Sequence, residues 1–468
     1  MIGCIIGQNF SCNLHYEKFA NGSVKCIEEE IPFDLPEGWV WVRLSSIADM
    51  ALGKMLDVAK NKGSLRPYLR NVNVRWGTFE LSDVLDMRFE DDELERYSIR
   101  HGDLVICEGG EPGRCAVWQS EEVVFYQKAL HRVRAIEVLP EYLYYVIRHF
   151  ITSTQYERYY TGTTIKHLTG QSLQVLPIPL PPMSEQQLIV KHLQHIIGEI
   201  DKVETEKSEA LSLVSLAKSK ILNLAISGQL VPQDPADEPA SVLLERIRAE
   251  KEELIKQGKL KRDKKESVIF RGEDNSYYLR TGDLVESLED WAFEELPDSW
   301  GICCLGELCD YGNCLNVDTA SISDSAWILD LEDIEKDSGV VLRKVRKSER
   351  NAASTKHFFH RGQVLYSKLR PYLNKVVLSD EDGYCTSEIL PLEFERNVLP
   401  QYARYYLMSP VFLEYANKCS YGVKMPRLGT VDGKKSIISI PPIEEQKRIV
   451  LAIEQAFTQL AAITQNLL

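Results

Sequence analysis

The 468-residue sequence contains no uninterrupted run of about 18 or more apolar residues, the length that a membrane-spanning helix requires. The short apolar run at residues 2–6 follows no basic residues, which argues against a secretory signal. The cysteines number eleven, which is odd, and no two of them have Cys-x-x-Cys spacing. We therefore expect free thiols in a reducing compartment rather than a disulfide framework, and we predict a cytoplasmic protein.

The sequence also lacks an evident metal site. Its densest group of cysteines has no histidine nearby and lacks the paired spacing of zinc ligands. This group comprises Cys303, Cys304, Cys309 and Cys314. Small buried side chains account for these residues, so we predict no metal ligands.

Motifs for DNA chemistry are missing as well. A methyltransferase of exocyclic amines would carry an Asn- or Asp-Pro-Pro-aromatic loop, but the two Pro-Pro pairs follow Leu180 and Ile440. No Gly-x-x-x-x-Gly-Lys-Ser/Thr phosphate loop occurs, as a translocating motor would need. Asp432 and Lys434 have no acidic partner shortly before them, so we interpret residues 432–434 as a turn rather than a nuclease site. We predict no catalytic residues and no enzyme activity for the chain by itself.

Net positive charge is absent too: the formal charge is −14. Taken alone, this value argues against a nucleic-acid partner. It does not exclude one, because phosphate contact depends on a local basic surface and the acidic residues gather in blocks such as 28–30 and 90–95. With 44% hydrophobic and 26% charged residues, the composition is that of a globular protein with two or three domains.

What the sequence does contain is a long helix, predicted over residues 183–227. Prolines end the preceding segment, Ser184 and Gln187 have the spacing of a capping box, and Gly228 supplies the stop. Its apolar positions alternate steps of four and three, with Lys207 as the one polar entry, and this pattern is typical of a coiled-coil seam. They are Ile189, Leu193, Ile196, Ile200, Val203, Ala210, Val214, Ala217, Ile221 and Leu224.

A partner helix is predicted at the end of the chain, over residues 442–468. The Pro-Pro-x-x-Glu-Gln motif at 181–186 returns at 441–446, an offset of 260 positions, and part of the seam returns with it. The repeated seam residues are Ile449, Ile453, Ala456, Leu460 and Ile463. Because this second helix is shorter, we expect residues 210–224 to pack on another subunit or on a further helix predicted at 241–257.

Segments throughout the chain repeat at this offset or, for the first of them, at 261 positions. Leu-Pro-x-x-Trp at 35–39 returns at 296–300, and three later segments also match, namely 100–105 with 360–365, 141–145 with 401–405, and 162–168 with 422–428. The sequence therefore predicts an α+β fold with two homologous domains joined by long antiparallel coiled-coil helices in a pseudo-two-fold repeat. The predicted boundaries are 1–34 for a lead-in, 35–182 and 266–441 for the two domains, 183–265 for the central helical region and 442–468 for the last helix.

Together with the central Ala-Ile-Ser-Gly-Gln-Leu-Val-Pro-Gln-Asp-Pro at 225–235, these motifs resemble the DNA-specificity subunit of type I restriction–modification enzymes over nearly the whole chain. The resemblance implies two target-recognition domains, each reading one half of a split, asymmetric site in double-stranded DNA. It implies helices that set the gap and hold two modification subunits, with restriction subunits as further partners. The partner subunits would then bind S-adenosylmethionine, ATP and magnesium, and this chain would bind no cofactor. The assembled complex would be a DNA adenine methyltransferase and ATP-dependent endonuclease.

The residues support this interpretation independently. Two similar units related by a pseudo-two-fold axis suit duplex DNA, which has two-fold axes of its own. The middles of the two units, residues 52–95 and 313–356, are unlike, so we expect different half-sites. A coiled-coil scaffold without DNA binding would explain the helices but not the paired basic turns described next.

Candidate DNA contacts lie in turns and loops at matching positions. Turns after an apolar strand carry Arg114 in the first half and Lys368, Arg370 and Tyr372 in the second. Arginine can bond guanine or phosphate there, although a structural turn with a surface arginine would look the same. Glycine-containing loops and a further segment supply the other candidates. The loop in the first half supplies Thr163, Thr164, Lys166 and His167, and the matching loop in the second half supplies Tyr421, Lys424 and Arg427. The further segment supplies Arg66, Tyr68, Arg70, Asn71 and Asn73. The basic run at 256–265 is either a solvated linker or a phosphate contact.

Overall fold

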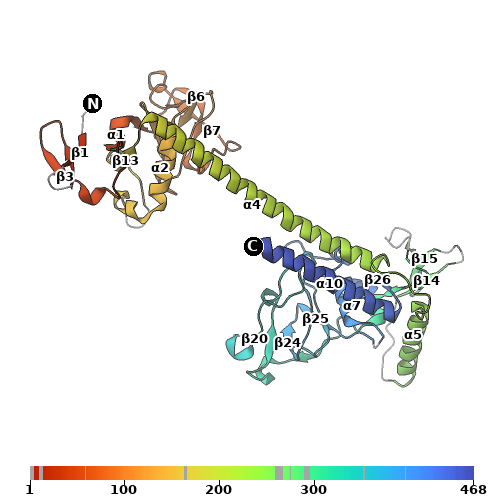
Figure 1. Ribbon diagram of the computed structural model, residues 1–468. Coiled ribbons are helices and arrows are strands. Elements are labelled where there is room, and N and C mark those ends of the chain that lie inside the picture. The colour runs from red at the N-terminus through yellow and green to blue at the C-terminus, as the bar shows by residue number, and fades with distance from the viewer. Residues whose placement is uncertain are drawn as a thin grey trace. The chain divides into compact units, whose positions relative to one another are not determined.

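The computed structural model describes residues 5–9, 14–57, 59–162, 166–258, 267–272, 274, 276–288, 296–350, 354–395 and 397–467. The chain forms two compact units, Met1–Val203 and Glu204–Leu468. Helix α4 (Met183–Ile226) is a continuous helix of 44 residues that begins in the first unit and ends in the second (Figure 1). The long helix predicted from the sequence is confirmed to within one residue at its end.

The first unit contains four small sheets. Their orders are β1-β2-β3, β10-β9-β12-β5, β7-β6-β11-β8 and β13-β4. The strands are β1 (Ile5–Asn9), β2 (Leu14–Lys18), β3 (Val24–Cys26), β4 (Val40–Arg43), β5 (Ala48–Leu52), β6 (Ser64–Leu69), β7 (Leu85–Phe89), β8 (Ser98–Ile99), β9 (Leu104–Cys107), β10 (Cys115–Val117), β11 (Val124–Tyr126), β12 (Leu130–Ala135) and β13 (Pro177–Leu180). Helices α1 (Leu44–Ile47), α2 (Pro140–Thr152) and α3 (Gly170–Gln174) complete the domain before α4.

The second unit repeats this plan. Its sheets have the orders β14-β15-β16, β17-β26, β18-β21-β24-β19-β20 and β23-β22-β25. The strands are β14 (Ser267–Arg271), β15 (Tyr277–Thr281), β16 (Leu284–Ser287), β17 (Gly301–Cys304), β18 (Asn316–Val317), β19 (Trp327–Leu329), β20 (Val345–Arg346), β21 (Lys356–Phe359), β22 (Val364–Ser367), β23 (Val376–Leu378), β24 (Gly383–Thr386), β25 (Ile389–Leu392) and β26 (Ile437–Ile440). The helices are α5 (Ala240–Lys256), α6 (Leu305–Leu308), α7 (Pro400–Met408), α8 (Pro410–Lys418), α9 (Thr430–Lys435) and α10 (Ile443–Leu467).

Strand pairing is equivalent in the two units. β11 runs parallel to β6 and β24 runs parallel to β19, whereas the other pairs among named strands are antiparallel. The first and last strands of each domain pair with each other, β4 with β13 and β17 with β26, which brings the start of the domain to its exit helix. The internal repeat predicted from the sequence is therefore a repeat of structure.

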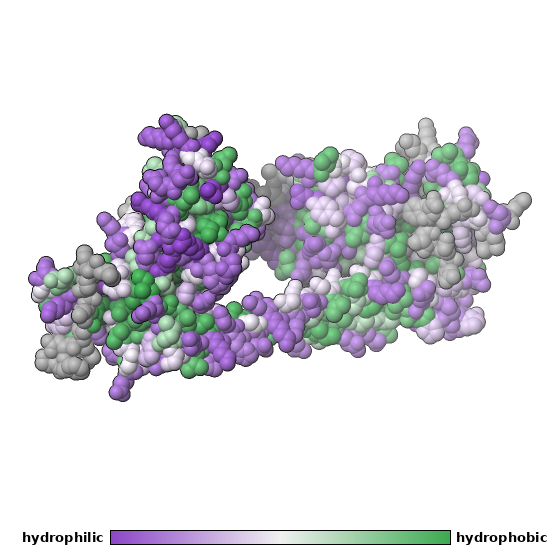
Figure 2. Space-filling model, turned by 90° about the horizontal axis from the view of Figure 1, so that it is seen from above, coloured by the Kyte–Doolittle hydropathy of each residue, from purple (hydrophilic) through white to green (hydrophobic). Residues whose placement is uncertain are grey.

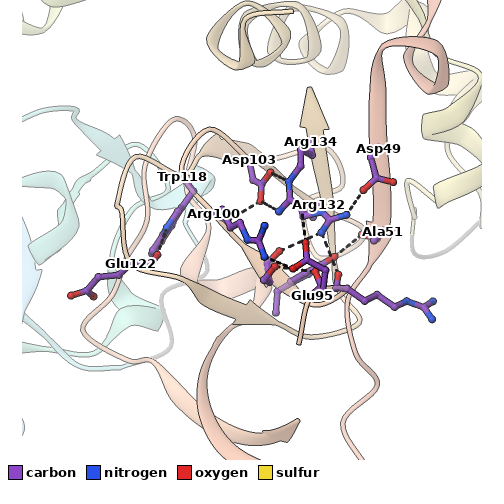
Figure 3. Close-up of polar contacts among 12 residues, drawn as sticks. Asp49, Ala51, Glu95, Arg100, Asp103, Trp118, Glu122, Arg132 and Arg134 are labelled. Atoms are coloured by element: carbon purple, nitrogen blue, oxygen red, sulfur yellow. Dashed lines mark hydrogen bonds and ion pairs between the residues drawn. The ribbon is translucent and has the colours of Figure 1, made fainter. Parts of the chain in front are cut away.

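Arginines on β12 contribute to the fold of the first unit through acidic partners (Figure 3). Arg134 donates from Nε and Nη2 to the carboxylate of Asp103 at 2.8 and 2.7 Å. Arg132 points toward Asp49 on the neighbouring strand β5 and makes an ion pair with it. Because these guanidinium groups are neutralised within the domain, they add little to a basic surface.

The seam of α4 differs from the expectation. Its last turns, with Leu222 and Ile226, are buried in the core of the second unit together with Ile449 and Ile453 of α10. Lys218 Nζ lies 5.8 Å from the ring centroid of Phe457, and Ser439 Oγ donates to the carbonyl of Ile226 at 2.8 Å, so α4 and α10 run antiparallel.

We expected residues 210–224 to pack on another subunit or on the helix at 241–257. Leu222 does share a core with Leu244 and Ile247 of that helix, but the expectation missed the contact with α10. The reason is direction: in an antiparallel pair, the end of α4 meets the start of α10. The uncovered part of the seam lies earlier, where Ile196, Ile200 and Val203 are each more than half exposed. Figure 2 shows apolar patches interspersed with polar surface on the face of the molecule that it presents.

The structure also bears on three smaller expectations. The helix predicted at 241–257 is confirmed as α5, with Leu244 and Ile247 in the core. The turn predicted at 432–434 is wrong, because these residues belong to the short helix α9, whose Gly433 packs directly against the ring of Tyr311. The cysteines at 303, 304 and 309 are buried as predicted, whereas Cys314 is only partly buried. Burial raises the pKa of Cys304 to about 12.

None of the described helices is long and apolar enough to cross a membrane. Within the described ranges, no three His, Cys, Asp or Glu side chains come together as metal ligands would.

Candidate nucleic-acid interface

In each unit a turn follows the central strand of one sheet. Residues 108–114 follow β9, and Gly110 and Gly113 adopt positive φ there. Residues 368–374 follow β22, and here the positive φ values belong to Arg370 (50°) and Asn374 (46°). Non-glycine residues seldom adopt this conformation, and they keep it only where neighbouring contacts hold it. The backbone N–H of Arg370 is held by the carbonyl of Pro426 at 2.7 Å.

A second loop is tied to each turn by main-chain hydrogen bonds. Thr161 and His167 exchange bonds of 2.9 and 2.8 Å, and Tyr421 and Arg427 exchange bonds of 3.1 and 3.0 Å. The next residue in each loop then bonds to the turn. Leu168 N donates to Glu108 O at 2.8 Å, and Leu428 N donates to Lys368 O at 3.0 Å. The two units therefore present the same turn–loop pair on the same backbone scaffold.

In the first unit the 3₁₀ turn Asn71–Asn73 joins this pair. Arg114 Nη2 donates to the carbonyl of Asn71 at 2.7 Å. A Cβ on Gly110 would lie 2.9 Å from the side chain of Asn71, and one on Gly109 would lie 3.0 Å from the ring of His167. A side chain at either position would require these neighbours to shift. Gly110 is favoured further by its positive φ of 80°, which side chains rarely adopt.

The structure thus brings together four of the predicted residues in this unit, Asn71, Arg114, Lys166 and His167. Lys166 Nζ lies 3.1 Å from Glu157 and 5.7 Å from the ring centroid of Tyr160. His167 is exposed. Thr163 and Thr164, which the sequence also predicts in this loop, lie outside the described residues, as do residues 259–265 of the basic run.

Two predicted contacts need correction. The side chains of Tyr68 and Asn73 are only 3% and 1% exposed. Tyr68 belongs to an aromatic core with Phe89 and Phe125, and the amide of Asn73 bonds to the carbonyls of Glu80 and Asp83, both at 3.0 Å. Both residues build the domain, since they are too deeply buried to contact a ligand at its surface.

Neighbouring arginines in this segment are also engaged. Arg66 lies over the ring of Phe125, 5.7 Å from its centroid. Arg70 Nη2 donates to both the carbonyl and the carboxylate of Asp83 at 2.7 Å. These contacts fix the edge of the first domain beside the turn–loop pair.

In the second unit the predicted residues lie together on the turn–loop pair. Tyr372 and Tyr421 are exposed, as is Lys424. Arg427 forms an ion pair with Glu388, and this contact lowers the pKa of Glu388. In the first unit, hydrogen bonds from Trp76 and then from Arg114 lower the pKa of Glu111.

Sequence reasoning missed these two carboxylates. Glu111 could have been found, because it precedes Arg114 by three residues in one turn. Glu388 had no such signal, since it is 39 residues from Arg427 and meets it only through the pairing of β22 with β25.

Two similar α+β domains that present equivalent turn–loop pairs define a recognition protein with two binding domains. The chain belongs to the family described as type I restriction modification DNA specificity domain, whose model matches residues 36–212 and 297–468. The resemblance predicted from the sequence is confirmed. The known role of specificity subunits is recognition of DNA sequence through two target-recognition domains, and they are non-catalytic.

Individual relatives agree with this assignment. The chain is 21% identical to the type I restriction enzyme EcoBI specificity subunit of Escherichia coli, over 96% of this chain and 86% of that protein. It is 22% identical to the EcoDI specificity subunit of the same species, over 73% and 68%.

Solved structures share the fold. A structure from work on complex assembly and conformational transition of the type I R-M system matches with a TM-score of 0.60 at 18% identity, over 93% of this chain and 94% of that chain. The HsdS subunit from Thermoanaerobacter tengcongensis matches with a TM-score of 0.50 at 19% identity, over 93% of each chain. The α+β fold with two homologous domains and long helices is thereby confirmed.

Proposed function

We propose that each domain reads one half of a split, asymmetric target in double-stranded DNA through its turn–loop pair. The observation that carries this proposal is the duplicated backbone scaffold with unlike side chains. Leu168 and Leu428 make the same bond to their turns, whereas His167 in the first loop is replaced by Arg427 in the second. Equivalent geometry with different donors suits two readers of different half-sites.

The helices would set the gap between half-sites and dock two modification subunits, with restriction subunits as further partners. The uncovered seam of α4 supports this role, because Ile196, Ile200 and Val203 form an exposed apolar stripe on a helix. We infer that those partners bind S-adenosylmethionine, ATP and magnesium and that this chain binds none of these three cofactors. The assembled complex would be a DNA adenine methyltransferase and ATP-dependent endonuclease acting in the cytoplasm.

The decisive experiment is to sequence methylated sites in cells that express this chain with a modification subunit. A bipartite, asymmetric site with a fixed gap is expected. A continuous site, or methyl transfer from S-adenosylmethionine by the purified chain alone, would contradict the proposal. Coexpression of the modification subunit without this chain provides the control for background methylation.

A further inference from the structure

Arg114 of the first turn is bound largely within its own domain. Arg114 donates from Nη1 to Glu111 at 2.5 Å and from Nη2 to the carbonyl of Asn71 at 2.7 Å. Its side chain is 14% exposed. Each terminal nitrogen of Arg114 keeps one further donor. Because the side chain is largely buried, these donors are poorly accessible, and Arg114 acts chiefly to hold the turn.

Arg427 is arranged differently. Its Nε and Nη2 face the carboxylate of Glu388, with Nε–Oε2 at 3.0 Å and Nη2–Oε1 at 2.8 Å. Nη1 makes one long contact of 3.4 Å to the carbonyl of Met425. A guanidinium has five N–H donors, so one donor on each terminal nitrogen is left over. The side chain is 34% exposed, so these two donors have access to a ligand.

The charge of the pair favours a base over a phosphate. Arg427 lowers the pKa of Glu388, which is therefore ionised, and the pair carries no net charge. A phosphate would gain little attraction from a neutral pair and would be repelled by the nearby carboxylate. A base edge is uncharged and does not meet this repulsion. Guanine offers two acceptors, O6 and N7, in the major groove, whereas adenine offers one acceptor and one donor.

The backbone fixes both members of the pair. Arg427 exchanges main-chain hydrogen bonds with Tyr421 and lies in a bridge with Leu369. The carbonyl of Glu388 accepts from Lys368 N at 3.0 Å, immediately before β25 begins. Two side chains held on fixed backbone and bonded to each other present their remaining donors with little loss of conformational freedom on binding.

Among the described residues, the first unit has no equivalent pair. Glu108 N donates to Ala129 O at 2.9 Å, as Lys368 N donates to Glu388 O, so Ala129 occupies the place of Glu388. His167 occupies the place of Arg427, as the shared bond pattern with Thr161 shows. The arrangement is therefore a property of the second domain alone.

We propose that Arg427 specifies a guanine in the half-site of the second domain and that Glu388 is the positioning residue that aims its free donors. This inference rests on the proposed function, and it adds the base and the residue that selects it.

The test uses the full chain assembled with its modification subunits and a pool of duplex DNA in which the positions of the second half-site are randomised. Wild type is expected to require guanine at one position. Arg427→Ala should reduce that preference about 10- to 100-fold, as loss of a bidentate contact does. Arg427→Lys keeps the charge but loses the fork, so it should lose the preference almost as fully. Selection at the first half-site serves as the internal control for folding and assembly.

Salt dependence separates a base contact from a phosphate contact. Arg427→Ala should leave the slope of log Kobs against log salt unchanged, whereas loss of a phosphate contact lowers its magnitude by about one. Glu388→Gln should weaken the guanine preference and steepen the slope, because the freed charge can then attract phosphate. Lys424→Ala, at an exposed lysine in the same loop, is the matched comparison for a change in charge without a change in base preference.

Three results would overturn the inference: a second half-site without guanine on either strand, an unchanged guanine preference in Arg427→Ala, or a reduced salt slope in Arg427→Ala with all base preferences retained. Failure of the proposed function looks different, since the wild-type assembly would then select no split site at all.

Discussion

The indole N–H of Trp300 donates a hydrogen bond to Glu445 Oε1 across 3.0 Å. Trp39 makes the same bond to Glu185 Oε2 at 2.8 Å. In each unit the bond joins the residue that opens the domain to the helix that leaves it. The repeated Leu-Pro-x-x-Trp and Pro-Pro-x-x-Glu-Gln motifs thus supply the donor and the acceptor of the same tryptophan–glutamate hydrogen bond in each unit.

Removing the hydrogen bond between Trp300 and Glu445 should destabilise the second unit. Trp300→Phe leaves a buried carboxylate without one of its donors, and we expect a loss of about 1–3 kcal/mol in the free energy of unfolding. Urea unfolding followed by circular dichroism measures it. Trp39→Phe is the matched control, with a smaller expected loss because Trp39 and Glu185 are only partly buried. Equal losses in the two variants would contradict the role assigned to burial.

The same carboxylate should make stability depend on pH. Burial raises the pKa of Glu445 above its usual value. A carboxyl whose pKa is raised in the folded state contributes stability that is present at acid pH and is lost as pH rises through the folded pKa. The neutral Glu445→Gln variant lacks this loss. We therefore expect the free energy of unfolding of Glu445→Gln, relative to that of wild type, to increase from about pH 4 to pH 7. If the difference between the two free energies does not change with pH, this reasoning is wrong.

The length of α4 should set the distance between half-sites. Inserting one heptad near Glu204 adds about 10 Å of helix and keeps the apolar seam nearly in phase. At roughly 3.4 Å per base pair, the gap in the methylated site should lengthen by up to about three base pairs while both half-sites keep their bases. The insertion lies before the part of α4 that packs with α10, so that packing does not oppose it. A fixed gap with altered bases would show that the length of α4 does not set the distance between the half-sites.

The exposed stripe on α4 should be needed for assembly. Ile200→Lys places a charge in the stripe, and we expect weaker copurification of the modification subunit with no change in the unfolding of the chain itself. Gln194→Lys adds the same charge at an exposed polar position of the same helix and should have little effect. Equal retention of the modification subunit by both variants would mean that it docks elsewhere.

Much of the architecture was predictable because helices and repeats leave periodic signals. The limits of α4 and α5 followed from prolines, glycine and apolar spacing. The covered part of the seam did not, because the direction of the partner helix is a tertiary property. Tyr68 and Asn73 were misjudged for a related reason. Aromatic and amide side chains look the same in sequence whether they face DNA or close a core, and only the pairing of β6 with β11 decides between these outcomes.

The bonds from Leu168 to Glu108 and from Leu428 to Lys368 involve only main-chain atoms. Any residue other than proline at the leucine position can make such a bond, so substitutions in the neighbouring loop residues leave the attachment intact. Mutations that alter the base preference of one domain can therefore accumulate without a matching penalty in folding. In evolutionary terms, each half of the chain can change its base preference while the main-chain attachment of its loop stays the same.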